Sequence, residues 1–257
     1  MLTIRADQLR IFEQTAAHQY ELELVEHCRS FAPELCATLS QSELLQGVRL
    51  GIAEARRNGL DQRGPTRFYV DLMIVFGAGF LRDPQYPWIA ETLSGPGSQL
   101  YRTEALHTKV ALYLARVDGE QNRYTRAALR ELSRRVASGI QPLPQRFEED
   151  LLNLMSEIHP RKVTETGQPN LVQLITRGRD RALGKHGFQD ARSQALWVTL
   201  TFAFGHAFDT DPFMPWIARS FSSRRGEFEP SVAARRLERR ALIWLNAVLK
   251  NSSTDVT

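Results

Sequence analysis

Two distant stretches of the chain carry the same uncommon sequence. Residues 76–94 read FGAGFLRDPQYPWIAETLS, and residues 204–222 read FGHAFDTDPFMPWIARSFS. The positions identical in register include the aspartate, both prolines and the tryptophan of a D-P-x-x-P-W pattern, namely Asp83, Pro84, Pro87 and Trp88 against Asp211, Pro212, Pro215 and Trp216. The similarity extends upstream, where 20–33 resembles 147–160, and downstream, where 106–117 resembles 237–248. A unit of about a hundred residues is therefore repeated, which predicts two similarly folded lobes.

The periodic stretches of the sequence have helical spacing. Ser40 and Glu43 form the S-x-x-E pattern of a capping box, and the apolar stripe that follows it includes Val48 and Ile52. Gly59 stands where a helix ends in a left-handed residue. No stretch shows the alternation of a strand, so the sequence predicts an all-α protein.

The repeat and the helical pattern together predict a domain plan. The first lobe comprises 1–117, a connecting helix and hinge occupy 118–146, the second lobe spans 147–250, and 251–257 form a flexible tail. Each lobe is expected to hold about five helices. In each lobe, Asp83–Pro84 or Asp211–Pro212 should start a short helix, because proline suits the first helical turn and aspartate caps free amides. These short helices should bury Trp88 and Trp216.

Composition indicates a soluble cytoplasmic protein. Hydrophobic residues make up 42% of the 257 and charged residues 24%, as in globular domains. No stretch reaches the roughly 18 uncharged apolar residues of a membrane helix, and the first residues lack the apolar core of a signal peptide. We therefore expect no contact with a membrane.

Catalytic and metal-binding candidates each have a simpler interpretation. Cys28 and Cys36, with His27 as a third ligand, could form a redox pair or half a metal site, but two small buried hydrophobes explain the cysteines better. Asp71 is the only charge in FYVDLMIVFG and could be a catalytic acid. Pairing with Arg67 one turn earlier, or capping of a neighbouring helix, is the interpretation that we favour.

Other catalytic patterns are absent from the sequence. The histidines have no metal-ligand spacing, the glycines lack the context of a phosphate loop, and the serines lack a nucleophile elbow. The sequence therefore predicts no catalytic residue, no cofactor and no metal, and we expect a protein that is not an enzyme.

Two arginine clusters are candidates for binding a partner, in a chain whose net charge is +4. The first, Arg123, Arg126, Arg130 and Arg134 with Arg135, draws a basic stripe along the connecting helix. The second comprises Arg219, Arg224, Arg225, Arg235, Arg236, Arg239 and Arg240. The simpler interpretation is that both clusters lie on solvent-exposed helix faces, but arginine guanidinium groups also bind carboxylates and phosphates through paired hydrogen bonds. Only Tyr124 interleaves the first cluster with an aromatic ring, which makes nucleic acid the weaker partner.

The stretches RADQLRIFEQ, HCRSFAPE, GIAEARRNGL and FYVDLMIVFGAGFLRDPQYPW resemble a little-characterised bacterial helical family. Its members are often encoded beside type VI secretion genes for the VgrG spike, the PAAR tip and toxic effectors. The resemblance covers about residues 4–117 well and the second repeat more loosely, whereas family members commonly carry one copy. It implies an accessory protein that binds an effector or a spike component, and it carries over no catalytic residue.

We therefore expect a cytoplasmic, non-enzymatic adaptor or chaperone of a type VI secretion cluster, which binds its protein partner through Arg123, Arg126, Arg130 and Arg134. Three alternatives stay open. The protein could be a cytosolic immunity protein that neutralises a cognate toxin, a nucleic-acid-binding helical protein, or an enzyme with a helical site around Asp71.

Overall fold

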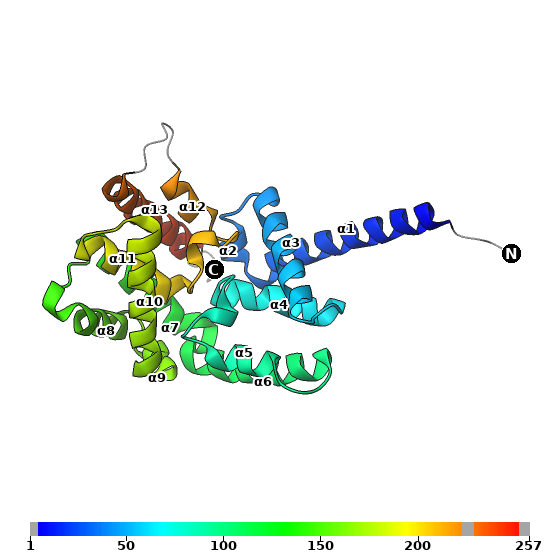
Figure 1. Cartoon of the computed structure of the whole chain (residues 1–257), viewed down its shortest axis with the longest axis horizontal. Helices are drawn as coiled ribbons and strands as arrows, with labels where there is room; N and C mark the ends of the chain where they lie inside the picture. Colours follow the sequence, from blue (N-terminus) through cyan, green and yellow to red (C-terminus); the bar gives the residue numbers. More distant parts are fainter. Residues whose placement is uncertain (1–4, 223–228, 252–257) are drawn as a thin grey trace.

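The computed structural model describes residues 5–222 and 229–251, and all the regular structure in these ranges is helical (Figure 1). Thirteen α-helices and four short 3-10 helices are present there, without a strand. The all-α prediction is confirmed. Among the described residues, no helix combines the length and the apolar character that crossing a bilayer requires.

The helices up to residue 117, which we call the first unit, precede a connecting helix. They are α1 (Ala6–Phe31), α2 (Pro33–Cys36), α3 (Gln41–Arg57), α4 (Arg63–Phe76), η1 (Phe80–Arg82), α5 (Pro87–Leu93) and α6 (Gln99–Val117). The short helix η2 (Glu120–Asn122) then leads into the connecting helix α7 (Arg123–Ser138).

The helices from residue 147 onward, which we call the second unit, follow η3 (Pro144–Arg146). They are α8 (Phe147–Ile158), α9 (Pro160–Thr166), α10 (Gln168–His186), α11 (Ala191–Phe204), η4 (Phe208–Thr210), α12 (Pro215–Phe221) and α13 (Pro230–Asn251). The two units thus have the same order of elements. Superposition of the two as near-copies stays a prediction, and residues 252–257 of the expected tail lie outside the described residues.

Local sequence signals set several helix ends. The Ser40 hydroxyl accepts from the amide of Glu43 at 3.3 Å, and the Glu43 carboxylate accepts from the amide of Ser40 at 2.8 Å, which completes the expected capping box. Gly59 has a φ of +71° just beyond α3, in the left-handed region that glycine adopts without strain. The expected capping box and left-handed helix end are both present.

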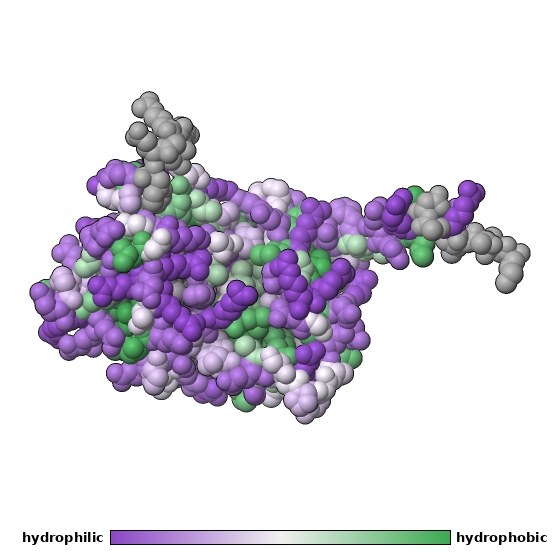
Figure 2. All heavy atoms as spheres, viewed as in Figure 1, coloured by the Kyte–Doolittle hydropathy of each residue, from purple (hydrophilic) through white to green (hydrophobic). Residues whose placement is uncertain are grey.

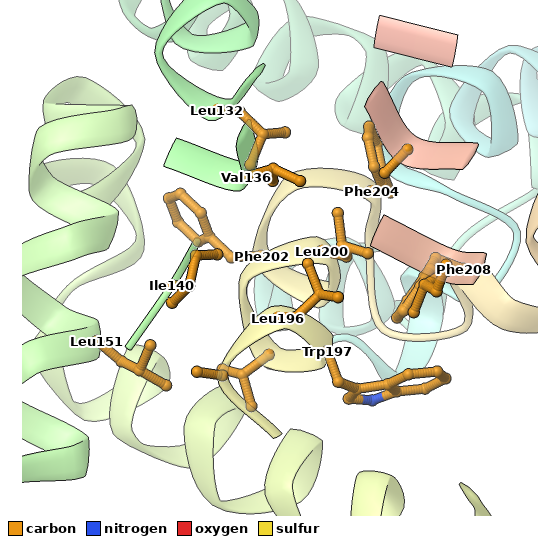
Figure 3. Close-up of a cluster of buried hydrophobic side chains, with 14 of the residues drawn as sticks. Leu132, Val136, Ile140, Leu151, Leu196, Trp197, Leu200, Phe202, Phe204 and Phe208 are labelled. Carbon is orange, nitrogen blue, oxygen red and sulfur yellow. The ribbon is translucent and has the colours of Figure 1, made fainter. Parts of the chain in front are cut away.

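Two clusters of buried apolar side chains form the core. One extends from Leu24 to Val117 in the first unit and also includes Phe213 of the second. The other joins α7 to the second unit and contains the fully buried Trp197, which Figure 3 shows beside Phe208. Phe213 therefore lies in the core of the opposite unit, where its ring contacts Gly47.

The prediction that Asp83 and Asp211 start helices is wrong. The short helices α5 and α12 begin at the second proline of each pattern, Pro87 and Pro215. Residues before these prolines form a tight turn, because the Asp83 carboxylate accepts from the amide of Gln85 at 2.9 Å and the Asp211 carboxylate accepts from the amide of Phe213 at 2.8 Å.

The two tryptophans of the repeated pattern differ in burial. Trp216 is 9% exposed, as expected, whereas Trp88 is only partly buried against the core of the first unit. The expectation of a buried indole therefore holds for the second unit and in part for the first.

Helix α1 is longer than its counterpart α8 and projects from the body as an arm (Figure 1). Side chains along this arm are exposed, including the apolar Leu9, Ile11 and Phe12. In the space-filling view, the arm carries hydrophobic green patches among hydrophilic purple ones (Figure 2).

Candidate functional site

The two aspartates of the repeated pattern connect the two units. The Asp83 carboxylate accepts from the amide of His206 at 2.7 Å, and the Asp211 carboxylate accepts from the amide of Ala78 at 2.8 Å. Each aspartate thus binds a backbone amide of the other unit. Burial raises the pKa of Asp211 to about 6, although the hydrogen bonds from the amides of Ala78 and Phe213 act to lower it. These carboxylates are structural, although their role is to join the units rather than to cap a helix.

Backbones approach closely at the same junction. A Cβ atom on Gly77 would lie 2.6 Å from the backbone oxygen of Phe204, and one on Gly205 would lie 2.5 Å from the backbone oxygen of Phe76. Both glycines also have φ near +90°. Only glycine fits these two positions, which explains why the repeat keeps both.

Lys162 of α9 is the one lysine buried among the described residues. Its Nζ donates to the backbone oxygen of Phe202 at 2.5 Å and lies 5.5 Å from the centre of the Tyr86 ring. Burial lowers the pKa of Lys162 to about 8, although Asp83 and Asp118 act in the opposite direction. No cavity adjoins this amine in the described pockets, so we assign it to packing between the units.

The lowered pKa of Lys162 predicts a pH dependence of stability. Between pH 8 and the usual lysine pKa, the folded protein binds fewer protons than the unfolded chain, so stability rises with pH there. Relative to Lys162→Met, the wild type should gain about 1 kcal/mol in the free energy of unfolding between pH 7.5 and pH 9. Urea titrations of both proteins at the two pH values measure this. An unchanged difference would contradict the lowered pKa.

Asp71 does not pair with Arg67 as we expected. Its carboxylate lies 2.7 Å from Nε2 of His27 on α1, and both side chains are part-buried. Burial raises the pKa of Asp71, which the hydrogen bond from His27 partly offsets. The aligned residue of the second unit is Thr199, whose hydroxyl donates to the backbone oxygen of Ala195 inside its own helix. Asp71 therefore binds a side chain of a neighbouring helix, which is neither the pairing with Arg67 nor the helix cap that we favoured.

The cysteines behave as small buried side chains. Cys28 and Cys36 are both free and buried, and the Cys36 thiol donates to the backbone oxygen of Cys28 at 3.2 Å. Burial raises the pKa of Cys28 to about 12, which disfavours a reactive thiolate. Within the described ranges, no three His, Cys, Asp or Glu side chains are grouped as metal ligands would be.

The arginine stripe on α7 is largely committed to neighbours within the chain. Arg123 donates to the Tyr124 hydroxyl at 2.6 Å, Arg126 lies 3.9 Å from Glu34, and Arg134 binds Glu131 at 2.6 Å. Arg130 is exposed without an ion pair in the described part of the chain. The structure therefore brings the stripe onto one helix and pairs Arg126 and Arg134 with carboxylates, whereas Arg123 and Arg130 have no ion pair among the described residues.

The second arginine cluster lines a groove instead. A groove of about 850 Å³ lies between α12 and α13 and is closed on one side by residues 37–38. Four arginines line it, Arg219, Arg236, Arg239 and Arg240, together with Pro215, Trp216, Ile243, Trp244 and Ala247. No carboxylate is among its lining residues. Arg235 lies on α13 outside the lining, and Arg224 and Arg225 lie outside the described residues.

Charges in this groove are only partly neutralised. Arg219 forms an ion pair with Glu43, and Arg236 donates to the backbone oxygen of Ser222 at 3.2 Å. Arg239 and Arg240 have no partner among the described residues. The groove is therefore a positively charged surface with at least two guanidinium groups available to an anion.

The floor of the groove is aromatic. The rings of Trp216 and Trp244 stack at 5.9 Å, and Nε1 of each indole is buried without an acceptor among the described residues. A buried donor without a partner costs about 1–3 kcal/mol. The sequence pattern pointed to the arginines but gave no sign that Trp244 and Ile243 would lie beside them.

An ion pair spans the corresponding surface of the first unit. There, Arg116 of α6 binds Glu165 of α9 at 2.7 Å. In the alignment of the repeats, Ala247 and Thr38 occupy these two positions. The smaller side chains leave the space open in the second unit. The groove is thus a point at which the two copies have diverged.

Comparison of the chain with models of protein families, with curated proteins and with solved structures found no match.

Proposed function

We propose that the protein is a binding protein, not an enzyme, which holds an acidic segment of a protein partner in the groove between α12 and α13. The observation that carries this proposal is the pair of partnerless arginines, Arg239 and Arg240, in a groove that has no carboxylate among its lining residues. A carboxylate-rich segment complements this charge and offers acceptor oxygens. An adaptor role in a type VI secretion cluster, as the resemblance implies, is consistent with such a site.

Single-stranded nucleic acid is the second candidate, because arginines and tryptophans occur together in this groove. Stacking of bases requires open aromatic faces, however. Trp216 is 9% exposed and packs on Trp244, so little of its ring is open. This burial favours the acidic protein segment.

Charge reversal at the groove should abolish partner binding without unfolding the protein. We expect Arg239→Glu/Arg240→Glu to lose at least tenfold in affinity for the partner that the wild type captures from its host, since the reversal turns attraction into repulsion. Arg130→Glu on α7 is the matched control and should bind as the wild type does. Capture, identification of the partner and titration with the purified partner measure the effect.

Two results would count against the proposal. A partner that binds the double variant as tightly as the wild type would place the site elsewhere, and loss of binding only in Arg130→Glu would return it to the α7 stripe. Rescue of cells from a toxin by the wild type, lost in the double variant, would identify the partner as a cognate toxin.

A further inference from the structure

The shape of the groove follows from the length of one short helix. The last helix of the first unit, α6, is covered by α9 of the second unit over seven residues, Pro160–Thr166. The corresponding helix beside α13 is α2 of the first unit, which has four residues and ends at Cys36. The chain continues through Ala37 and Thr38, which line the groove. The last turn of α9 thus corresponds to a tight turn after α2, in which the amides of Thr38 and Leu39 donate to the backbone oxygens of Leu35 and Cys36.

Polarity changes along the groove. Arg236, Arg239 and Arg240 lie in the middle of α13, and Ile243, Trp244 and Ala247 follow one to two turns later on the same side of the helix. From Arg236 to Ala247 the helix rises about 16 Å. One end of the groove is thus cationic and the other apolar. Ile243 is 59% exposed, so the apolar end is open to solvent.

We infer that the groove binds a short helix of the partner that carries carboxylates at one end and apolar residues at the other. Its acidic end binds Arg239 and Arg240, and its apolar end covers Ile243 beside the turn that follows α2. This inference rests on the proposed function and adds the order of residues in the partner. The first unit offers an internal template, since Glu165 of its covering helix pairs with Arg116 on α6.

Two synthetic peptides of the same composition test this order. Each has about twelve residues, enough to span about 16 Å as a helix. In one, glutamates fill the first half and leucine and alanine the second. In the other, the same residues are interspersed. Fluorescence anisotropy with the full-length protein measures the affinities of both peptides. Circular dichroism checks that the two peptides have the same helicity.

We expect the segregated peptide to bind at least tenfold more tightly than the interspersed peptide. Ile243→Asp and Arg239→Glu/Arg240→Glu should each reduce its affinity at least tenfold, whereas Arg130→Glu should leave it unchanged. Because Ile243 is exposed, its variant should unfold at the wild-type temperature, which a thermal melt checks.

The inference would be overturned if the two peptides bound with equal affinity, or if Ile243→Asp left the affinity of the segregated peptide unchanged. It would also be overturned if oligodeoxythymidine bound more tightly than the segregated peptide and this binding depended on Arg239 and Arg240. The proposed function is tested separately from this inference. If capture of the natural partner depends on Arg239 and Arg240 while the two peptides bind equally, the proposed function stands and only the inference is wrong.

Discussion

Gly77→Ala should destabilise the protein by at least about 3 kcal/mol, since a φ of +87° strains alanine and its Cβ would lie 2.6 Å from the backbone oxygen of Phe204. Backbone atoms of the opposite unit cannot move aside as a flexible side chain can. Gly205→Ala meets the backbone oxygen of Phe76 in the same way and should behave alike. Thermal and urea unfolding measure the loss, which corresponds to a fall in Tm of roughly 6 °C or more.

Gly184→Ala is the matched control. Gly184 lies in the last turn of α10, is exposed, and would place its Cβ in open space. Alanine there should stabilise the protein by up to about 1 kcal/mol, because glycine lowers helix stability. A Gly77→Ala protein as stable as the wild type would show that the units do not pack through Gly77 and Gly205.

Asp209→Asn should have the second large effect, a loss of about 3 kcal/mol at neutral pH, because breaking a buried ion pair leaves its cations uncompensated. The Asp209 side chain is 1% exposed and binds Arg181 and Lys185 at 2.6 Å each, with His186 at 3.3 Å. Lys185 keeps part of its hydration, since its side chain is 47% exposed. The expected loss therefore lies at the lower end of the range for buried pairs.

The pH dependence of this loss has a definite sign. Burial opposes ionisation of Asp209, but the hydrogen bonds from His186 and Lys185 and the charge of Arg181 hold the pKa of its carboxyl well below its usual value. A lowered pKa contributes stability above the unfolded value, which is lost as the pH falls. The difference between wild type and Asp209→Asn should thus be constant from neutral pH to about 5 and shrink below about 4.

Asp180→Asn controls for the loss of one negative charge on the same face. Asp180 lies on α10 near Arg181, but it is exposed and has no ion pair in the described part of the chain. Its variant should unfold like the wild type across the same pH range. An Asp209→Asn protein that matched it at neutral pH would show that the cations around Asp209 are satisfied by water.

Local patterns in the sequence were enough to predict the helices. The capping box at Ser40, the left-handed Gly59 and the apolar stripes act within a few residues, so their physical effect does not depend on the rest of the fold. The connecting helix is present at Arg123–Ser138, and each unit has six α-helices where about five were expected. The repeated aspartates were also visible, although the Asp-Pro step indicated helix caps.

Only the tertiary structure decided what those repeated residues do. Asp83 and Asp211 bind amides more than a hundred positions away, and no local propensity encodes a contact of that separation. The pairing of Asp71 with His27, where sequence spacing favoured Arg67, has the same cause.

The groove follows the same rule. Arginine spacing along α13 drew attention to a basic helix, but the groove exists because Ala247 and Thr38 leave space beside Trp244, and these residues come from opposite units. The sequence by itself determined the helices and the repeat through short-range backbone and side-chain preferences. Packing of one unit against the other determined the junction and the binding surface, because both are built from side chains that meet only in the folded chain.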